Sequence, residues 1–255
     1  MISGIHVRAD GDRAMERFKR IYTELRDRIC TNRYRPGTVL NETELAAEFG
    51  VSRTPIRRVL QKLNHDGLVS TRNGVGSLVT DVDTRTFEDL YRLRMKLAAI
   101  IGELSPTVDP GSHIPAFERL LEQARKLGPL ADYEAIGKLN VAVVNALQEL
   151  IESEPLKEIT LLMYFRTARI WHKNIPKLDW AEEVALVNAE ISEILRALHM
   201  GDVAGVGFVR RNFIAMAFAR VKRAIEDAEK ATPPVPGDQL RKPILEPDQT
   251  AETET

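Results

Sequence analysis

Three arginines stand near the start of one amphipathic segment, VSRTPIRRVLQKLNHDGLV, at residues 51–69. Arg53 and Arg57 are four residues apart and would share one face of a helix, with Arg58 beside them. The positive end of a helix dipole favours acidic side chains, so these arginines need another explanation. A guanidinium donates paired hydrogen bonds to a phosphate or to the edge of a guanine. The residues therefore suit a phosphate-rich partner, and a solvated surface helix is the plain alternative.

The elements expected around the arginines form a helix-turn-helix. Helical periodicity predicts helices over residues 13–31, 42–49 and 53–66. Gly50 would end the second helix, Ser52 would cap the third and Gly67 would end it. In a helix-turn-helix the later helix enters the DNA major groove with its N-terminal residues at the bases. The hydroxyls of Ser52 and Thr54 would then donate to phosphates.

A β-hairpin is expected directly after this unit. Residues 68–82 contain two short β-prone runs around Asn73-Gly74, and an Asn-Gly pair between such runs indicates a hairpin turn. Helices followed by a hairpin make a winged helix-turn-helix. Gly74 lies in the predicted turn, and Arg72 beside it joins the candidate DNA contacts.

Charge and composition agree with a DNA-binding N-terminal part in an otherwise ordinary globular protein. The net charge is −1 overall, but residues 1–82 hold 14 basic and 10 acidic side chains, a net +4. Hydrophobic residues make up 44% and charged residues 29%. No run approaches the roughly 18 apolar residues of a membrane span, and no secretory signal is recognisable. One cysteine, Cys30, allows no internal disulfide, so a cytoplasmic location is expected.

The rest of the chain shows only helical periodicity. The predicted helices cover residues 86–103, 113–127, 132–152, 155–174, 180–199 and 202–229. Short connections between them favour an all-α bundle over residues 86–230. The Pro-rich, acidic tail 231–255 is predicted to be disordered, and residues 1–13 are predicted to be a flexible N-terminus before the DNA-binding domain at 14–82. The fold class is therefore mainly α.

The segment RPGTVLNETELAAEFGVSRTPIRRVLQKLNHDGLVSTRNGVGSLV resembles the DNA-binding domain of the GntR family of bacterial transcription regulators. The resemblance covers about residues 15–80. It implies that Arg35, Arg53 and Arg57 occupy DNA-contact positions and that Gly74 lies at a wing tip entering the minor groove. Relatives often carry Glu where this chain has Arg58, so the family's operator preference is not transferred to this protein.

The second domain is similar to the all-helical ligand-binding domain of the FadR-type branch, through DLYRLRMKLAAI (89–100) and ILRALHMGDVAGVGFVRRNF (194–213). Many relatives hold a divalent metal through one Asp and three His. The register of the resemblance places Asn140, Val144, Ile191 and Phe213 at those positions. Apolar side chains cannot ligate a metal. The resemblance therefore implies that the metal site is lost, and no cofactor is expected.

An effector must then be held by other groups. Arg94 matches a pocket arginine of the family, and a carboxylate effector would suit a bidentate arginine. Asn140, Arg166, Arg169 and Asn212 fall on helices expected to face the bundle interior and complete the candidate effector site. Each could instead be a surface charge or a satisfied core group. The carboxylates Glu182 and Glu183 are expected to face solvent.

The sequence thus predicts a homodimeric, ligand-responsive regulator, a repressor, that binds a pseudo-palindromic operator and senses a small organic acid. No nucleophile elbow, phosphate loop or dinucleotide fingerprint occurs, so an enzyme is not expected. The alternative is an architectural DNA-binding protein whose helical domain only dimerises. A domain of about 145 residues is larger than dimerisation alone needs.

Overall fold

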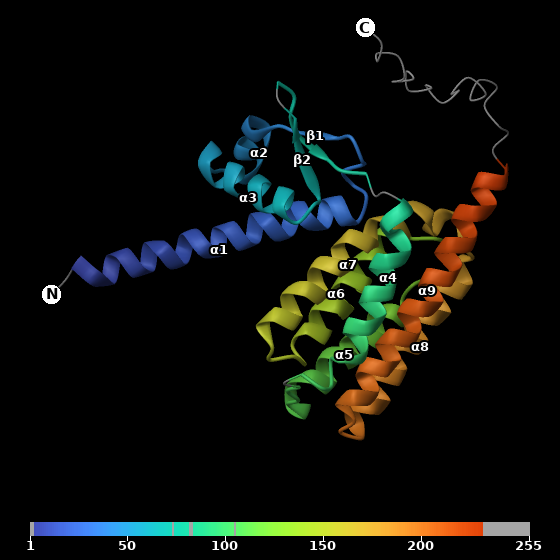
Figure 1. Ribbon diagram of the computed structural model, residues 1–255. Coiled ribbons are helices and arrows are strands. Elements are labelled where there is room, and N and C mark those ends of the chain that lie inside the picture. The colour runs from blue at the N-terminus through green and yellow to red at the C-terminus, as the bar shows by residue number, and fades with distance from the viewer. Residues whose placement is uncertain (1–2, 73, 82–83, 105, 232–255) are drawn as a thin grey trace, which may run out of the picture.

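The computed structural model describes residues 3–72, 74–81, 84–104 and 106–231. Figure 1 shows an N-terminal unit with a small sheet on one side of a long first helix and a helical bundle on the other. The predicted mainly α fold, a winged helix-turn-helix followed by a helical bundle, is confirmed. The predicted disordered tail beyond residue 231 lies outside the described residues. None of the described helices is long and apolar enough to cross a membrane.

The N-terminal unit has the expected order of helices and hairpin. Its elements are α1 (Ser3–Cys30), β1 (Val39–Leu40), α2 (Glu42–Phe49), α3 (Arg53–His65), β2 (Val69–Arg72) and β3 (Gly76–Val79). The first helix begins at Ser3, so the predicted flexible segment 1–13 is helical from that residue on. The periodic apolar positions start only at Met15, which is why the sequence pattern missed the earlier turns.

Local chemistry explains the helix-turn-helix. Asn41 caps α2 by accepting hydrogen bonds from the backbone N–H groups of Thr43 and Glu44. Gly50 ends the helix in the left-handed region at φ 63°, where glycine is favoured. Ile56, with Val59, Leu60 and Leu63, lies on the buried face of α3 and leaves the arginines outside.

The sheet has a strand that the sequence pattern did not reveal. β1 pairs antiparallel with β3, in the order β1-β3-β2, with Val39 opposite Leu78. Two residues are too short for an alternating pattern to be recognised. The strand ties the turn before α2 to the hairpin, so the wing is fixed to the helix-turn-helix.

The bundle is formed by helices close to the predicted ranges. They are α4 (Thr84–Ala99), α5 (Pro110–Arg125), α6 (Tyr133–Gln148), α7 (Glu154–Asn174), the single 3-10 turn η1 (Ile175–Lys177), α8 (Trp180–His199) and α9 (Val203–Ala231). The predicted helix 86–103 ends early, at Ala99. Gly102 lies so close to α9 that an added Cβ would be 2.4 Å from the backbone of Ala204. The segment that follows α4 can therefore approach α9 this closely only because residue 102 is glycine.

The two units share one apolar cluster. Ile21, Leu25 and Ile29 of α1 belong to the same buried cluster as Tyr164 and Phe165 of α7. The guanidinium of Arg26 lies 3.8 Å from the centroid of the Phe165 ring, and the Cys30 thiol donates to the Phe165 carbonyl at 3.6 Å. Helix α7 is therefore covered by the N-terminal unit on one side and by the bundle on the other.

Candidate nucleic-acid interface and effector cavity

The arginine face of α3 is open to solvent. The side chains of Arg53 and Arg57 are 61% and 57% exposed. Both contact the carboxylate of Glu42: Arg57 donates from Nε at 3.1 Å and Nη2 at 2.9 Å, and Arg53 from Nη2 at 3.2 Å. The two guanidinium groups hold the pKa of Glu42 below its usual value. The carboxylate gathers both arginines at the start of the helix, where an incoming phosphate would compete for them.

The neighbouring polar groups are also available. Ser52 is exposed and makes no side-chain hydrogen bond to the helix that it precedes, although it has the backbone conformation of an N-cap. Thr54 and Arg58 are exposed on the same turns, and the Arg58 guanidinium lies 6.0 Å from the centroid of the Phe18 ring. These side chains surround Arg53 and Arg57 with hydrogen-bond donors.

The hairpin and a preceding loop supply the remaining candidates. Arg72 is exposed at the end of β2, opposite Gly76. Gly74 has φ 77° and nothing within 4 Å of a Cβ added there, as expected for an open wing tip. Arg35 is exposed in the loop before β1, and its carbonyl accepts from the N–H of Thr38 at 3.0 Å. Asn73 lies outside the described residues.

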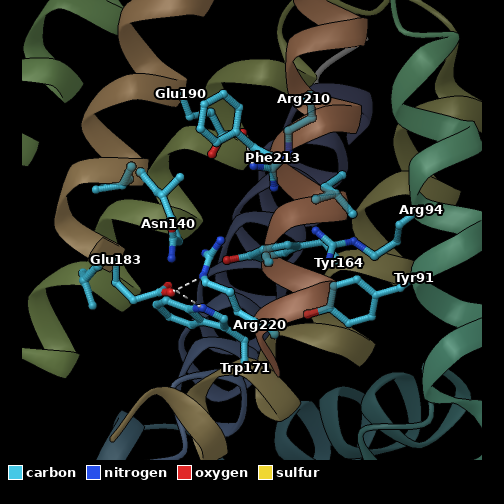
Figure 2. A pocket seen from close by; sticks show the side chains of 16 residues that line it. Tyr91, Arg94, Asn140, Tyr164, Trp171, Glu183, Glu190, Arg210, Phe213 and Arg220 are labelled. Carbon is cyan, nitrogen blue, oxygen red and sulfur yellow. Dashed lines mark hydrogen bonds and ion pairs between the residues drawn. The ribbon is translucent and has the colours of Figure 1, made fainter. Parts of the chain in front are cut away.

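A second candidate site is a cavity of about 80 Å³ inside the bundle. Figure 2 shows side chains from α4, α6, α7, α8 and α9 converging on it. Its walls combine aromatic side chains, Tyr91, Tyr164 and Trp171, with charged ones. A mostly apolar cavity with a few convergent polar groups is typical of a small-molecule site.

Two buried ion pairs border the cavity. Arg210 donates to Glu190 at 2.6 Å, and Arg220 donates to Glu183 at 2.6 Å. Glu183 also accepts from the indole N–H of Trp171 at 3.1 Å, as the dashed lines in Figure 2 mark. The expectation that Glu183 faces solvent is wrong, since its side chain is 4% exposed. The basic partners Arg210 and Arg220 were not among the predicted site residues, because the arginines of their helix are typical of a solvent-exposed surface in the sequence.

Arg94 is the unusual charge in this cavity. Its guanidinium reaches from α4 toward the cavity, donates to Thr167 Oγ1 at 2.7 Å and lies over the rings of Tyr91 and Tyr164. No carboxylate of the described residues forms an ion pair with it. Burial lowers the pKa of Arg94 to about 10, because desolvation disfavours the charged form. Buried charges are costly unless they are paired, so Arg94 is a candidate residue for contact with an anion.

The structure brings together only part of the predicted effector set. Arg94 and Asn140 line the cavity. Arg166 and Arg169 do not: they extend from the other side of α7 to the DNA-binding unit, where Arg166 Nε donates to the Asp66 carbonyl at 3.1 Å and Arg169 Nη1 to the Thr80 carbonyl at 2.6 Å. Asn212 is exposed on α9. Helical spacing could not decide between the two covered faces of α7.

The residues at the family's metal positions do not fit a metal. Asn140 and Phe213 line the cavity, Val144 is buried beside it and Ile191 is buried in the core. Within the described ranges, no group of three or more His, Cys, Asp or Glu side chains could hold an ion. Amide, alkyl and phenyl groups at these positions offer no set of ligands for a divalent metal.

The fold is that of a winged helix-turn-helix protein, with exposed arginines at the start of its third helix. Residues 18–79 match the family model described as bacterial regulatory proteins, gntR family. Over these residues the N-terminal unit is similar to the bacterial regulatory proteins that this family model describes.

Curated relatives match over similar stretches. The chain is 30% identical over 115 residues to the HTH-type transcriptional regulator YdhC of Bacillus subtilis (strain 168), covering 45% of this chain and 51% of that protein. It is 28% identical over 106 residues to the gluconate operon transcriptional repressor of the same organism, covering 42% of this chain and 43% of the repressor. The chain thus spans about half the length of the curated relatives it matches.

Solved structures share the whole architecture. The chain aligns with E. coli McbR/YncC at a TM-score of 0.68 and 20% identity, covering 82% of this chain and 98% of that one. A transcriptional regulator GntR from Rhodococcus sp. RHA1 aligns at a TM-score of 0.62 and 23% identity, covering 82% and 99%. At these identities the likeness establishes the fold alone.

Proposed function

We propose that this protein is a ligand-responsive transcription regulator that binds an operator through its N-terminal unit and a small organic acid through its bundle. The exposed pair Arg53 and Arg57, at the start of the second helix of a gntR-family helix-turn-helix, carries the DNA-binding part. That position places donors at base edges in the major groove.

The buried, unpaired guanidinium of Arg94 supports an anionic effector. A carboxylate bound at Arg94 would neutralise the buried guanidinium. Asn140 on the cavity wall would supply a further hydrogen bond. The neighbouring arginines, Arg210 and Arg220, are already paired with glutamates. The anion would therefore bind at Arg94 in preference to Arg210 or Arg220.

Helix α7 supplies a physical connection between the two sites. Tyr164, Ala168 and Trp171 line the cavity, while Arg166 and Arg169 on the same helix hold the backbone at both ends of the hairpin. An acid bound at Arg94, which already contacts Thr167, would favour one position of α7 over another. Operator affinity would change by the difference in acid affinity between the two states.

The proposed assembly is a homodimer on a pseudo-palindromic operator. Exposed apolar side chains on the adjoining helices α4 and α9, Leu93, Phe208 and Met216, support a subunit interface there. Repression is proposed because one relative is a repressor by name. Expression of a reporter behind the selected operator, with and without the protein, tests the sign.

Selection of bound duplexes from a randomised pool tests the DNA-binding role. A two-fold symmetric consensus bound tightly in fluorescence anisotropy is expected, with weak binding to its scrambled version. Binding that is equal for both duplexes would contradict an operator-specific regulator. Repeating the titration with a panel of organic acids separates a regulator from an architectural protein, since an architectural protein would bind DNA with unchanged affinity throughout.

A further inference from the structure

A second, smaller cavity adjoins the first behind Arg94. It has about 20 Å³ of space, more than the roughly 10–15 Å³ that a single water needs. Arg94, Tyr164, Arg210 and Ile214 line both cavities. A ligand held at Arg94 could therefore extend into this space.

The second cavity contains buried polar groups without partners. Gln148, at the end of α6, is 8% exposed, and neither its Oε1 nor its Nε2 is within hydrogen-bond distance of a partner among the described residues. The hydroxyl of Thr160, on α7, is buried and unpartnered as well. Buried amides and hydroxyls are costly unless they form hydrogen bonds, so these groups indicate a site for a polar ligand group.

The chemistry of the cavity selects the kind of group. The Gln148 amide both donates and accepts, and so does the Thr160 hydroxyl. A carboxylate only accepts and would leave the Gln148 carbonyl without a donor. Of the two guanidinium groups on its walls, Arg210 is already paired with Glu190, and Arg94 is the proposed partner of the carboxylate. Most of the remaining walls are apolar, with Leu97, Ile101 and Leu147 among them, and they disfavour a second charge. A neutral group that donates and accepts is therefore the best complement.

We propose that the effector is a small carboxylic acid with a carboxamide at its other end, its carboxylate on Arg94 and its neutral end between Gln148 and Thr160. The inference rests on the proposed effector site and adds the chemical class of the ligand. Arg94 would supply affinity, and Gln148 would supply discrimination.

The test uses the full-length protein and matched acids. Malonamate, succinamate and glutaramate differ in length and carry a terminal carboxamide, and each is paired with the fatty acid of the same chain length. Calorimetric Kd values are measured for wild type, Gln148→Leu and Thr160→Val. Gln123→Leu is the control, because Gln123 is exposed on α5. Thermal unfolding without ligand shows that each variant is folded.

In the wild type, at least one amide acid should bind about tenfold or more tightly than its fatty acid partner. Gln148→Leu should abolish that preference, leave fatty acid binding within about twofold, and raise or preserve the Tm, because an unsatisfied buried amide is removed. Thr160→Val should weaken the preference, and Gln123→Leu should keep it. A protein in which a water merely satisfies Gln148 would show unchanged ligand preference and a lower Tm in Gln148→Leu.

The proposal is overturned if no amide acid is preferred, or if Gln148→Leu keeps the preference. Arg94→Met distinguishes failure of the proposed effector site from failure of the inferred ligand class. If it abolishes binding of every acid while Gln148→Leu changes nothing, the effector site stands and the inferred ligand class fails. If the wild type binds none of the acids, both fail.

Discussion

Exposure separates two kinds of arginine in this protein. Arg53 and Arg57 lie in solvent and share the carboxylate of Glu42, so their charge is available to a partner at little desolvation cost. Arg94 is buried, and the described residues provide it with a hydroxyl and two aromatic faces but no carboxylate. The same side chain would therefore suit the proposed operator DNA on the surface and the proposed small anion in the interior.

Arg57→Ala should weaken specific operator binding by about 1–3 kcal/mol and reduce the slope of log K against log salt by about 1, because one bidentate or phosphate contact is lost. Anisotropy titrations at two salt concentrations measure both. Arg119→Ala, at an exposed position of α5, is the control and should change neither. An Arg57 variant that binds like wild type would remove α3 from the interface.

His172 should make stability depend on pH. Burial lowers its pKa to about 4 from the ordinary 6.5, so the unfolded chain binds a proton that the folded protein does not between these values. The contribution of the neutral His172 to the free energy of unfolding is fully present above pH 6.5 and is lost as the pH falls to about 4. Over that range the free energy of unfolding falls by about 3 kcal/mol.

Urea unfolding at pH 7 and pH 5 measures this effect as the difference between wild type and His172→Leu. The variant should lose less stability than wild type on acidification. The same substitution at the exposed His65 should leave the acid sensitivity as it is in wild type. Equal losses in wild type and His172→Leu would contradict a buried neutral imidazole.

At the scale of the elements, the close packing of α4 on α9 positions the cavity. Arg94 extends from α4 and Arg210 from α9, and these two helices make the most extensive contact in the bundle. Gly207 of α9 lies against α4: a Cβ there would be 2.7 Å from the carbonyl oxygen of Ala98. Backbone atoms cannot give way as a flexible side chain can, so the two helices would have to separate.

Gly207→Ala should therefore destabilise the protein by about 1–3 kcal/mol and weaken acid binding, because the overpacking outweighs the helix propensity gained, about 1 kcal/mol. Chemical unfolding and the acid-induced Tm shift measure both effects. Gly128→Ala is the control, since nothing lies within 4 Å of its added Cβ. A Gly207 variant as stable as wild type would mean that the interface relaxes freely.

At the scale of the whole molecule, α1 and α7 join the DNA-binding unit to the bundle through shared buried residues and polar contacts. Arg169 is central to the polar part. It is buried and donates to both the carbonyl and the hydroxyl of Thr80, and its Nε has no hydrogen-bond partner among the described residues. Burial lowers its pKa, a sign that the charged form is held at a cost.

Arg169→Met should destabilise the protein by about 1–3 kcal/mol, because the carbonyl and hydroxyl of Thr80 lose the guanidinium that donates to them. It should reduce the effect of a bound acid on operator Kd, which is typically 1–3 kcal/mol in coupled systems. Operator titrations with and without an acid that stabilises the wild type measure the coupling. By linkage, acid titrations with and without operator must give the same value. Coupling of wild-type size in the variant would exclude this contact as the connection.

Local features of the sequence were enough to predict the helix-turn-helix, the hairpin and the helical nature of the rest. Gly50 and the apolar spacing of α3 act within a few residues of themselves, so their consequences can be predicted without the fold. The exposed arginines of α3 follow from the same spacing, because the face opposite an apolar stripe lies in solvent.

Only the tertiary structure decided which covered helix faces line the cavity and which contact the N-terminal unit. Arg166 and Arg169 looked like cavity residues, and Glu183 looked solvated, because periodicity marks a face as covered or open without naming the element that covers it. The strand β1 needed β3 as its partner. Gln148 became a candidate ligand group only when α4, α7 and α9 enclosed it without a hydrogen-bond partner, since burial and satisfaction depend on residues distant in the chain.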